Sequence, residues 1–367
     1  MKHLVLLGAG HAHIHVLSTL AKQPLAGVKV TLVAPYPRQL YSGMVPGFVA
    51  GYYTLDDCVI PLAPLLKNTG IEWLPHSVTV LNSDAGTLTL DDGRELGYDW
   101  LSVNTGPVQD RQKIEQVMPG AREYGLFVRP IETFGALWPR VTELAKEHAL
   151  RMVIIGGGAA GIELAMAVWH RLPGASVTLV TGGDAVGANY TPAVQKRIAH
   201  ALKQRNISVV TELAVGIQAG EVTLASGTHL PCDVPLIATG AQAPAWLADS
   251  GLALDERGFL AVDACQRSTS HAHVFAAGDV STRMDLSLAR SGVYAVRAGP
   301  ALLTNLTAAL SGASPQPHMP PINTLNLLSC GNREAIASWG SYSAQGRWVW
   351  WLKDWIDRSF IKRYQRG

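Results

Sequence analysis

The stretch LVLLGAGHAHIHVLSTLA, from Leu4 to Ala21, joins an apolar run to two glycines and three alternating histidines. The apolar run is typical of a buried strand, and the spacing of the later apolar residues favours a helix. Glycines between a strand and a helix let the backbone approach a pyrophosphate, which the free N–H groups of the helix start then bind. The stretch therefore predicts a dinucleotide-binding turn, with His13 where the third glycine of G-x-G-x-x-G is expected.

The three histidines raise the alternative of a metal site. If a helix begins near His11, then His11 and His15 lie on one face while His13 points roughly 200° away. The three side chains then cannot converge on one ion, so we predict no metal site. His11 and His15 are expected to pack or form hydrogen bonds, and His13 is the stronger candidate for contact with a cofactor.

The same design recurs in the middle of the chain. HLVLLGAGHAH is followed by VKVTLVA, and RMVIIGGGAAG is followed by SVTLVTG. Each copy has an apolar run, a glycine-rich turn, a helical stretch and a second β-rich run, which is the order of a βαβ unit. The second copy has all three glycines, Gly156, Gly158 and Gly161. Two such units are much stronger evidence for dinucleotide binding than one isolated motif.

Each half also has a later strand that ends in small residues. YDWLSVNTGP ends in Asn104-Thr105-Gly106 and VPLIATGA ends in Thr239-Gly240. The alternating residues of GTLTLDDGRELGYD and GEVTLASGTHLPCD predict a hairpin before each of them. Further on, VFAAGD brings Gly278 and Asp279 to the end of a strand, where the carboxylate can accept a hydrogen bond from a sugar-alcohol hydroxyl. A solvated aspartate in a turn is the alternative.

Both copies lack the acidic residue that usually ends the second strand and binds the ribose hydroxyls. The positions are Ala34 in the first copy and Thr181-Gly182 in the second. No arginine follows immediately either, so the choice between NADH and NADPH stays open.

Composition limits the function classes further. The 367 residues are 48% hydrophobic and 16% charged, which fits a well-packed α/β enzyme. A net charge of +2 argues against a dedicated nucleic-acid binder. The four cysteines lie far apart in the sequence, without zinc or disulfide spacing, which indicates a reducing compartment.

The two glycine turns, the two Thr-Gly turns and the Gly278-Asp279 turn resemble those of the two-dinucleotide-binding-domain flavoproteins, which form the pyridine nucleotide-disulfide oxidoreductase superfamily. The resemblance covers roughly residues 1–300. The resemblance implies an α/β fold of two Rossmann-like domains, in which an FAD domain is interrupted by an NAD(P) domain. The implied ranges are 1–108 and 253–330 for the FAD domain, 109–252 for the NAD(P) domain and 331–367 for a small C-terminal segment.

The resemblance also implies the residues that contact the cofactors. For FAD these are Gly8, Ala9, Gly10, His11, His13, Ser42, Gly43, Thr105, Gly106, Gly278, Asp279, Ser291 and Gly292. For NADH or NADPH these are Gly156, Gly157, Gly158, Ala159, Ala160, Gly161, Thr181, Thr239 and Gly240. Glu163 is a candidate catalytic residue, because the resembling dehydrogenases have a glutamate close to where nicotinamide meets flavin. A helix-face glutamate bonded to neighbouring backbone is the alternative.

The branch of the family is indicated by two segments. YSGMVPG and LARSGVYAVRAGPALLTNL resemble type II NADH:quinone dehydrogenases, sulfide:quinone reductases and, most nearly, the NADH-dehydrogenase-like flavoproteins associated with selenide, water dikinase. They imply an FAD-dependent NAD(P)H dehydrogenase with a quinone-like acceptor. The alternatives are an enzyme that oxidises sulfide or a selenium compound, and a flavin-bound redox sensor or scaffold with negligible turnover.

The last 21 residues, 347–367, include four tryptophans and predict an amphipathic helix. On a helical wheel, Trp348, Trp351 and Trp355 share one side with Leu352 and Ile356, and the polar residues Lys353, Asp354 and Asp357 lie opposite. An aromatic face with net positive charge is typical of a helix on a membrane surface. We therefore expect a cytoplasmic protein with peripheral membrane contact through this segment. Packing on the protein body or against the mate of a homodimer are the alternatives.

Overall fold

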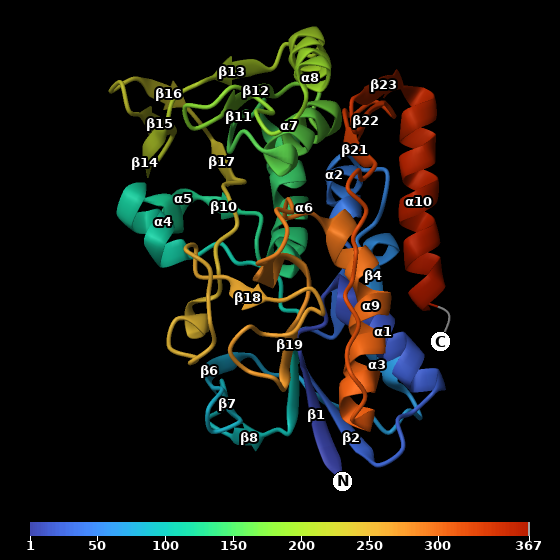
Figure 1. Cartoon of the computed structure of the whole chain (residues 1–367). Coiled ribbons are helices and arrows are strands. Elements are labelled where there is room, and N and C mark those ends of the chain that lie inside the picture. The colour runs from blue at the N-terminus through green and yellow to red at the C-terminus, as the bar shows by residue number, and fades with distance from the viewer. Residues whose placement is uncertain (366–367) are drawn as a thin grey trace.

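The computed structural model describes residues 1–365, and two five-stranded parallel sheets dominate it (Figure 1). The first sheet has the order β5-β2-β1-β9-β19 and the second has the order β13-β12-β11-β17-β10. In both, the strand before the glycine turn lies between the second strand of its βαβ unit and the later closing strand. The predicted α/β fold with two Rossmann-like units is confirmed, and the sheets show that the sequence repeat is a repeat of topology.

The elements that build these two sheets and their helices have the following bounds. The first sheet consists of β1 (Lys2–Leu7), β2 (Val28–Val33), β5 (Glu72–Leu74), β9 (Trp100–Val103) and β19 (Val274–Ala276). The second consists of β11 (Arg151–Ile155), β12 (Ser176–Val180), β13 (Ser208–Val210), β17 (Val234–Ile237) and β10 (Leu126–Phe127). The main helices are α1 (His11–Lys22), α6 (Ile131–Glu147), α7 (Ala159–Arg171), α8 (Pro192–Gln204), α9 (Gly292–Ser311) and α10 (Arg347–Gln365).

The apolar runs before the two glycine turns form central strands of sheets that are covered on both faces by other parts of the protein. Residues Leu4 to Leu7 of β1 are at most 2% exposed, and β1 pairs in parallel with both β2 and β9. A strand buried on both faces has no polar face to alternate with, so its sequence reads as a continuous apolar run. The carboxyl ends of β1 and β11 thereby deliver the two glycine turns to one edge of each sheet.

Both predicted hairpins are present. Strands β6 (Val78–Asn82), β7 (Thr87–Leu90) and β8 (Glu95–Gly97) form one three-stranded antiparallel sheet. Strands β14 (Ala214–Gln218), β15 (Glu221–Leu224) and β16 (His229–Pro231) form its counterpart. In the sequence, each small sheet is inserted between the second strand and the closing strand of its half, so the two halves share this insertion as well.

The two halves are joined by two chain segments that lie side by side. Val108 and Gln242 form an antiparallel bridge, in which each backbone N–H donates to the carbonyl oxygen of the other. Gln109 strengthens the junction, because its side-chain amide donates to the Ile237 oxygen and its Oε1 accepts the Arg129 N–H. The chain therefore enters and leaves the second half at neighbouring points, as the predicted interruption of the FAD domain requires. The domain boundaries themselves remain a prediction.

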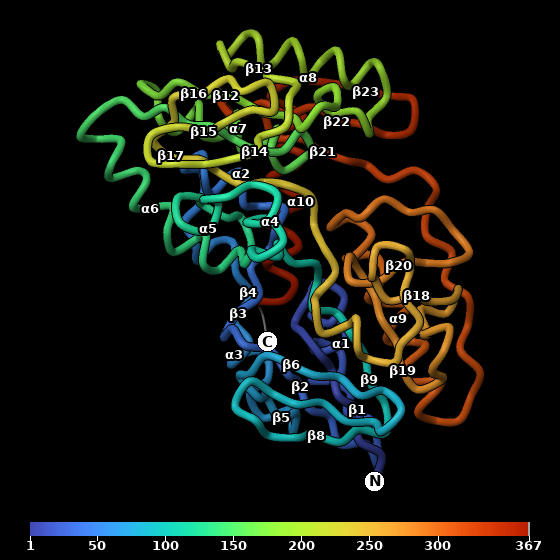
Figure 2. Tube along the Cα trace, turned by 90° about the vertical axis from the view of Figure 1, so that its left-hand side faces the viewer, coloured from blue at the N-terminus to red at the C-terminus, as the bar shows by residue number. Residues whose placement is uncertain are grey.

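After the second half the chain returns to the first sheet through β18 (Leu260–Val262), β19 and β20 (Ser281–Arg283). Helix α9 then packs on α1, and the small sheet β21 (Asn326–Ser329), β22 (Ala335–Trp339) and β23 (Tyr342–Gly346) follows. Figure 2 shows that β22 and β23 lie next to α8, so the C-terminal segment reaches the second half of the molecule. Helix α10 then runs along the side of the protein toward α1 and α3 (Leu62–Leu66) (Figure 1).

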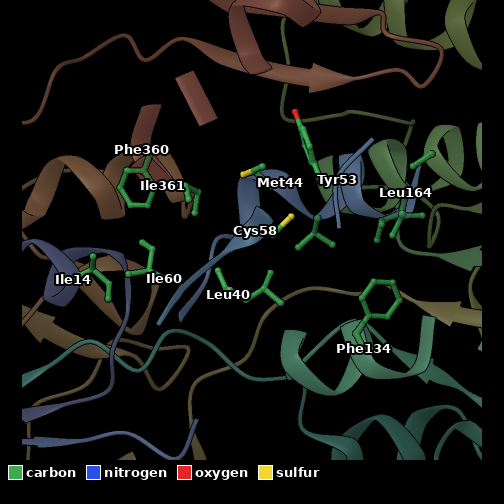
Figure 3. Close-up of a cluster of buried hydrophobic side chains, with 14 of the residues drawn as sticks. Ile14, Leu40, Met44, Tyr53, Cys58, Ile60, Phe134, Leu164, Phe360 and Ile361 are labelled. Atoms are coloured by element: carbon green, nitrogen blue, oxygen red, sulfur yellow. The ribbon is translucent and has the colours of Figure 1, made fainter. Parts of the chain in front are cut away.

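The inner face of α10 belongs to the main hydrophobic core. Phe360 and Ile361 lie near Ile14 of α1 and near Ile60 of β4 (Val59–Pro61) (Figure 3). The same cluster extends to Phe134 of α6, so it connects the C-terminal helix with both halves. Among residues 1–365 there is no helix that combines the length and the apolar character needed to span a bilayer.

The predicted helix is present, but its polar side is not the solvent side. Lys353 and Asp357 are buried at 9% and 4% exposure, while Trp348, Trp351 and Trp355 are 58%, 61% and 67% exposed. The tryptophans do share one face, as predicted. Its opposite face is occupied by an ion pair rather than by water, because that pair finds partners inside the protein.

Candidate functional site

The turn between β11 and α7 has the three glycines in three different surroundings. Gly156 has φ +134°, and a Cβ there would lie 2.7 Å from the Ala238 carbonyl carbon. A Cβ on Gly161 would overlap the Gly156 oxygen, so this glycine permits the close approach of helix and strand. Gly158 instead faces open space. The turn is tight on the protein side and open on the side where a pyrophosphate would lie.

The backbone N–H groups of this turn are available to a ligand. Within residues 1–365, the N–H groups of residues 157–161 donate no hydrogen bond to another protein group. They stand at the N-terminus of α7, where unpaired donors and the helix dipole together favour an anion. The predicted NAD(P) residues Gly157, Gly158, Ala159, Ala160 and Gly161 are therefore brought together in one turn, and their contact with a phosphate remains a prediction.

The turn between β1 and α1 differs, because Asn104 occupies part of it. A Cβ on Gly8 would lie 2.6 Å from the Thr105 Cα, and one on Gly10 would overlap Asn104. The Asn104 Oδ1 accepts the N–H groups of Ala12 and His13, both at 3.1 Å, and its backbone oxygen accepts the Gly10 N–H. The Ala9 and His11 N–H groups make no bond to the described part of the chain. Asn104 belongs to the small-residue turn noted in the sequence, where no role was predicted for it, although an amide at the end of a central strand is a usable signal.

His13 fills the place of the third glycine with a fully bonded ring. Its Nδ1 lies 2.5 Å from the Gly8 oxygen and its Nε2 lies 2.8 Å from the Ser102 Oγ. The side chain is completely buried between α1 and the first sheet, and burial lowers the pKa of His13 to about 4. The imidazole therefore links α1 to the first sheet through hydrogen bonds, where a glycine would allow the helix and the strand to pack closely. Both ring nitrogens of His13 thus have protein partners, and a contact of His13 with FAD remains a prediction.

The other two histidines of the turn also have protein partners. The ring of His11 packs edge-on against Tyr41, and the Nδ1 of His15 lies 3.2 Å from the Tyr364 Oη. The three rings do not converge, in agreement with the helical geometry. Among the described residues, the one group of potential metal ligands close enough to share an ion is His76, Asp91 and Asp92. It lies in the first antiparallel hairpin, and Asp91 and Asp92 are exposed there.

Several predicted FAD residues meet near the start of α9. Asp279 follows β19, and the backbone of Ser291 lies close enough to its carboxylate to oppose the rise that burial causes in the Asp279 pKa. A Cβ on Gly292 would lie 3.6 Å from the Ser42 Oγ, so the loop before α2 (Val45–Val49) reaches the helix start. Arg129 also faces this region, since its charge opposes the rise that burial causes in the Asp279 pKa. No sequence pattern had pointed to Arg129.

Unpaired polar atoms mark the same regions. The His11 Nε2, the Ser291 Oγ and the Thr239 Oγ1 are three of the eight buried side-chain polar atoms that have no hydrogen-bond partner among the described residues. Buried polar atoms nearly always have partners, so these three are free to bond to ligand atoms. Gly106 and Gly240 face open space, which leaves room for a ligand at the end of each closing strand. The residues present fit a dinucleotide in each half.

Thr181 fits its predicted role less well. Its Oγ1 donates to the Asp184 oxygen within the same turn, and the residue is 7% exposed. The hydroxyl is therefore already used in holding the loop after β12. A contact between Thr181 and the ribose of a nicotinamide nucleotide remains a prediction.

Glu163 lies in the second turn of α7 beside the C-terminal segment. Its Oε1 accepts the Ser329 N–H at 2.7 Å. Protein atoms surround the carboxyl group densely, and this burial raises the pKa of Glu163 to about 7, against the opposing effect of the Lys353 charge. Lys353 in turn donates to the Asp357 Oδ2 and to the Gly43 oxygen, both at 2.8 Å. A carboxyl group that titrates near neutrality thus lies close to the start of α7, beside the C-terminal segment.

Comparisons with known proteins agree with this geometry. Residues 2–299 match the family model of the pyridine nucleotide-disulphide oxidoreductases. An NADH dehydrogenase-like protein of Mycobacterium tuberculosis is 27% identical over 310 residues, which cover 78% of this chain and 74% of that protein. The demethylphylloquinone reductase NdbB of Synechocystis sp. is 26% identical over 299 residues, 77% and 73% of the two chains. The solved sulfide:quinone oxidoreductase of Aquifex aeolicus has the same fold, with a TM-score of 0.82, 18% identity and coverage of 100% and 92%.

Proposed function

The chain belongs to the pyridine nucleotide-disulphide oxidoreductase family and is an FAD-dependent NAD(P)H oxidoreductase, and we propose that it passes the electrons to a quinone. When bound, FAD accepts a hydride from the nicotinamide and releases two electrons to the next acceptor. The observation that carries the proposal is the pair of glycine turns, one in each half, with open space beside Gly158 in the second turn and free Ala9 and His11 N–H groups in the first.

The residues of the chain divide the work of binding between the two turns. The free N–H groups of residues 157–161 and the dipole of α7 hold a pyrophosphate, and Gly158 leaves room for it. In the first turn, Ala9 and His11 offer the remaining N–H groups, and Arg129 adds a positive charge close to Asp279. Asp279 stands where it can accept a hydrogen bond from a polyol chain. Glu163 holds a proton at neutral pH in part of the molecules, next to the place where the two cofactors are expected to meet.

The cysteines favour a quinone as the electron acceptor over a relay through thiols, because they form no disulfide and the thiol near Glu163 is buried. Among the described residues Cys58, Cys232, Cys265 and Cys330 are all free. Cys330 follows the residue bonded to Glu163, yet it is fully buried and its pKa is raised to about 12. A thiol that stays protonated is a poor nucleophile and a poor partner for sulfide chemistry. The relative named as a demethylphylloquinone reductase supports a quinone as acceptor for this chain.

We expect NADH or NADPH to bleach the flavin of the purified protein under anaerobic conditions, and a short-chain quinone to restore the colour. The measurement is a stepwise titration with NADH, NADPH and sulfide, followed through the flavin absorption bands. Bleaching by sulfide alone would replace this proposal with the sulfide-oxidising alternative. A flavin that none of the three reduces would instead indicate a sensor or scaffold, and a protein unable to retain FAD would contradict all of these readings.

The exposed tryptophan face of α10 fits a bilayer surface near such an acceptor. Trp348, Trp351 and Trp355 lie on one side, and Lys362 and Arg363 are exposed toward the end of the helix. Indole rings favour the lipid–water interface, and the cations favour anionic headgroups. The buried face fixes the helix to the protein, so the tryptophans are presented outward. We therefore propose peripheral binding to an anionic membrane.

Replacing all three exposed tryptophans by serine is expected to weaken binding to phosphatidylglycerol-containing vesicles at least about tenfold, or ~1.4 kcal/mol. The loss follows from removal of the aromatic surface that enters the interface. Vesicle cosedimentation measures it, and Val117→Ser, another exposed apolar position at 72% exposure, is the control. Unchanged vesicle binding together with a changed elution volume in gel filtration would instead identify this face as a homodimer interface.

A further inference from the structure

The end of β12 lies directly beside the glycine turn of the second half. A Cβ on Gly157 would lie 2.8 Å from the Thr181 Cβ, and the Gly156 N–H donates to the Val180 oxygen. In a dinucleotide-binding unit the pyrophosphate lies on the turn, and the adenosine ribose lies at the end of this second strand. The residues around Thr181 therefore bear on which ribose the second half accepts. NADH has a free 2′-hydroxyl there, and NADPH has a 2′-phosphate.

A carboxylate stands at this place, although it comes from the neighbouring strand. Strands β12 and β13 are paired in the second sheet (Figure 1). Glu212 follows β13, and its backbone oxygen accepts the Gly182 N–H at 3.0 Å. The Glu212 Oε2 accepts the Ser226 N–H at 3.2 Å, while Oε1 has no hydrogen-bond partner among residues 1–365. One carboxylate oxygen is thus held by the protein, and the other is free to accept a ribose hydroxyl.

The loop after β12 leaves room for a nucleoside. Gly182 and Gly183 are exposed, with φ +79° and +96°. A Cβ on Gly183 would meet no protein atom within 4 Å, and the nearest atom to a Cβ on Gly182 is the Leu213 Cδ2 at 3.7 Å. Leu213 is 56% exposed, so an apolar side chain is available to an adenine ring beside Glu212.

The charge at this place is negative. Residues 172–195 and 206–256 contain no Lys or Arg, and these stretches include the loops that follow β12 and β13. The charged side chains of the two loops are Asp184 and Glu212. A phosphate monoester carries a charge of about −1.5 to −2 at neutral pH. Sites for NADP accommodate it with a nearby arginine, whereas two carboxylates repel it.

The cations of the following helix have other partners or positions. Arg197 and Arg205, on and just after α8, are bonded to the C-terminal segment. Lys203 lines a depression at the start of β13, which is the end of that strand away from Glu212. Lys196 is exposed near the start of α8 and is the remaining candidate to bind a phosphate. It is therefore included in the experiment.

We propose that the second half selects NADH over NADPH, and that Glu212 replaces the acidic residue that β12 lacks by accepting a hydrogen bond from the adenosine ribose. Asp184 adds negative charge without a bond to the sugar. The two carboxylates exclude the 2′-phosphate, because no Lys or Arg of the two loops balances them. This selection rests on the proposed nucleotide site of the second half.

ADP-ribose and its 2′-phosphate are the probes, since their binding requires neither hydride transfer nor an electron acceptor. Isothermal titration calorimetry on the FAD-loaded protein is expected to show at least about tenfold tighter binding of ADP-ribose. Higher salt should narrow the difference, because the excluded group acts through its charge. The ratio of kcat/KM for NADH and NADPH is expected to have the same direction.

Two variants separate the hydrogen bond from the charge. Glu212→Gln is expected to weaken binding of ADP-ribose about fivefold or more, since an ionic acceptor is lost, and to strengthen binding of the 2′-phosphate. Asp184→Asn is expected to strengthen binding of the 2′-phosphate alone. Glu147→Gln, which removes an exposed carboxylate before the far end of β11, is the control. Lys196→Met is expected to leave both affinities unchanged.

The possible failures are distinguishable. Equal affinity for the two probes, or tighter binding of the 2′-phosphate that Lys196→Met abolishes, would overturn the selection and leave the proposed function in place. Binding of neither probe would remove the nucleotide site of the second half, and with it both proposals. A preference for ADP-ribose that Glu212→Gln leaves unchanged would overturn the role given to Glu212.

Discussion

Gly158→Val is expected to lower the affinity for NADH and NADPH at least about 100-fold, or ~2.7 kcal/mol, while FAD stays bound. The second glycine of the β11–α7 turn is the one whose Cβ position meets no protein atom within 4 Å. Its backbone is extended, with φ −79°, so a valine is compatible with the local conformation. The isopropyl group would occupy the space in which the proposed pyrophosphate lies. The expected result is therefore loss of one ligand without loss of the fold.

The affinity is measured by anaerobic bleaching of the flavin over a range of NADH concentrations, and the FAD content is measured on the same samples. Gly174→Ala is the matched control, because a Cβ there makes only an ordinary contact at 3.8 Å with Ala149. Equal loss of FAD and of NADH binding would mean that the valine disturbs the whole molecule. Undiminished bleaching by NADH would remove this turn from the nucleotide site.

His13→Ala is expected to lower the free energy of unfolding by about 3 kcal/mol at neutral pH. The substitution leaves the Gly8 oxygen and the Ser102 hydroxyl without their imidazole partner and opens a cavity beside β1. The loss is measured by urea unfolding of the FAD-bound protein, and the exposed His200→Ala is the control. A change of only a few tenths of a kcal/mol would show that the ring adds little to the joint between α1 and the sheet.

The same histidine makes stability depend on pH with a definite sign. Burial lowers the pKa of His13 to about 4 in the folded protein, whereas the unfolded chain titrates near the ordinary histidine value of about 6.5. The unfolded state binds more protons between these values, so the contribution is complete above the higher pKa and is lost as pH falls. From about pH 7 to about pH 5 this one residue is expected to remove roughly 2 kcal/mol. His13→Gln should flatten that part of the stability profile.

Much of the architecture follows from the sequence because it depends on local patterns that repeat. The two glycine turns, their flanking strands and the hairpins around Asp92-Gly93 and residues 225–228 all have short-range signals, and the structure contains each of them. The doubled order of the sheets then follows from the rules for parallel βαβ units. The burial of Leu4 to Leu7 is likewise evident in an uninterrupted apolar run.

The features that escaped the sequence analysis depend on contacts between distant segments. Asn104 bonds to amides about 90 positions earlier, and the link between Lys353 and Gly43 spans 310 positions. The periodicity of α10 does not reveal that Lys353 and Asp357 face inward. A helical wheel separates polar from apolar residues, but it does not locate the protein interior. The bond between His13 and Ser102 is equally absent from the sequence pattern, since Ser102 approaches His13 only in the folded sheet.

The bridge between Val108 and Gln242 has an evolutionary and practical consequence. When a chain departs from and rejoins a structure at adjacent points, everything between those points can be exchanged without stretching the remainder. A short loop across this gap could replace the intervening half, and a related half with a different nucleotide preference could be grafted there. The first half would then be the constant part of the enzyme, and the second half would be an exchangeable nucleotide-binding unit. The two are joined by the hydrogen-bonded segments at Val108 and Gln242.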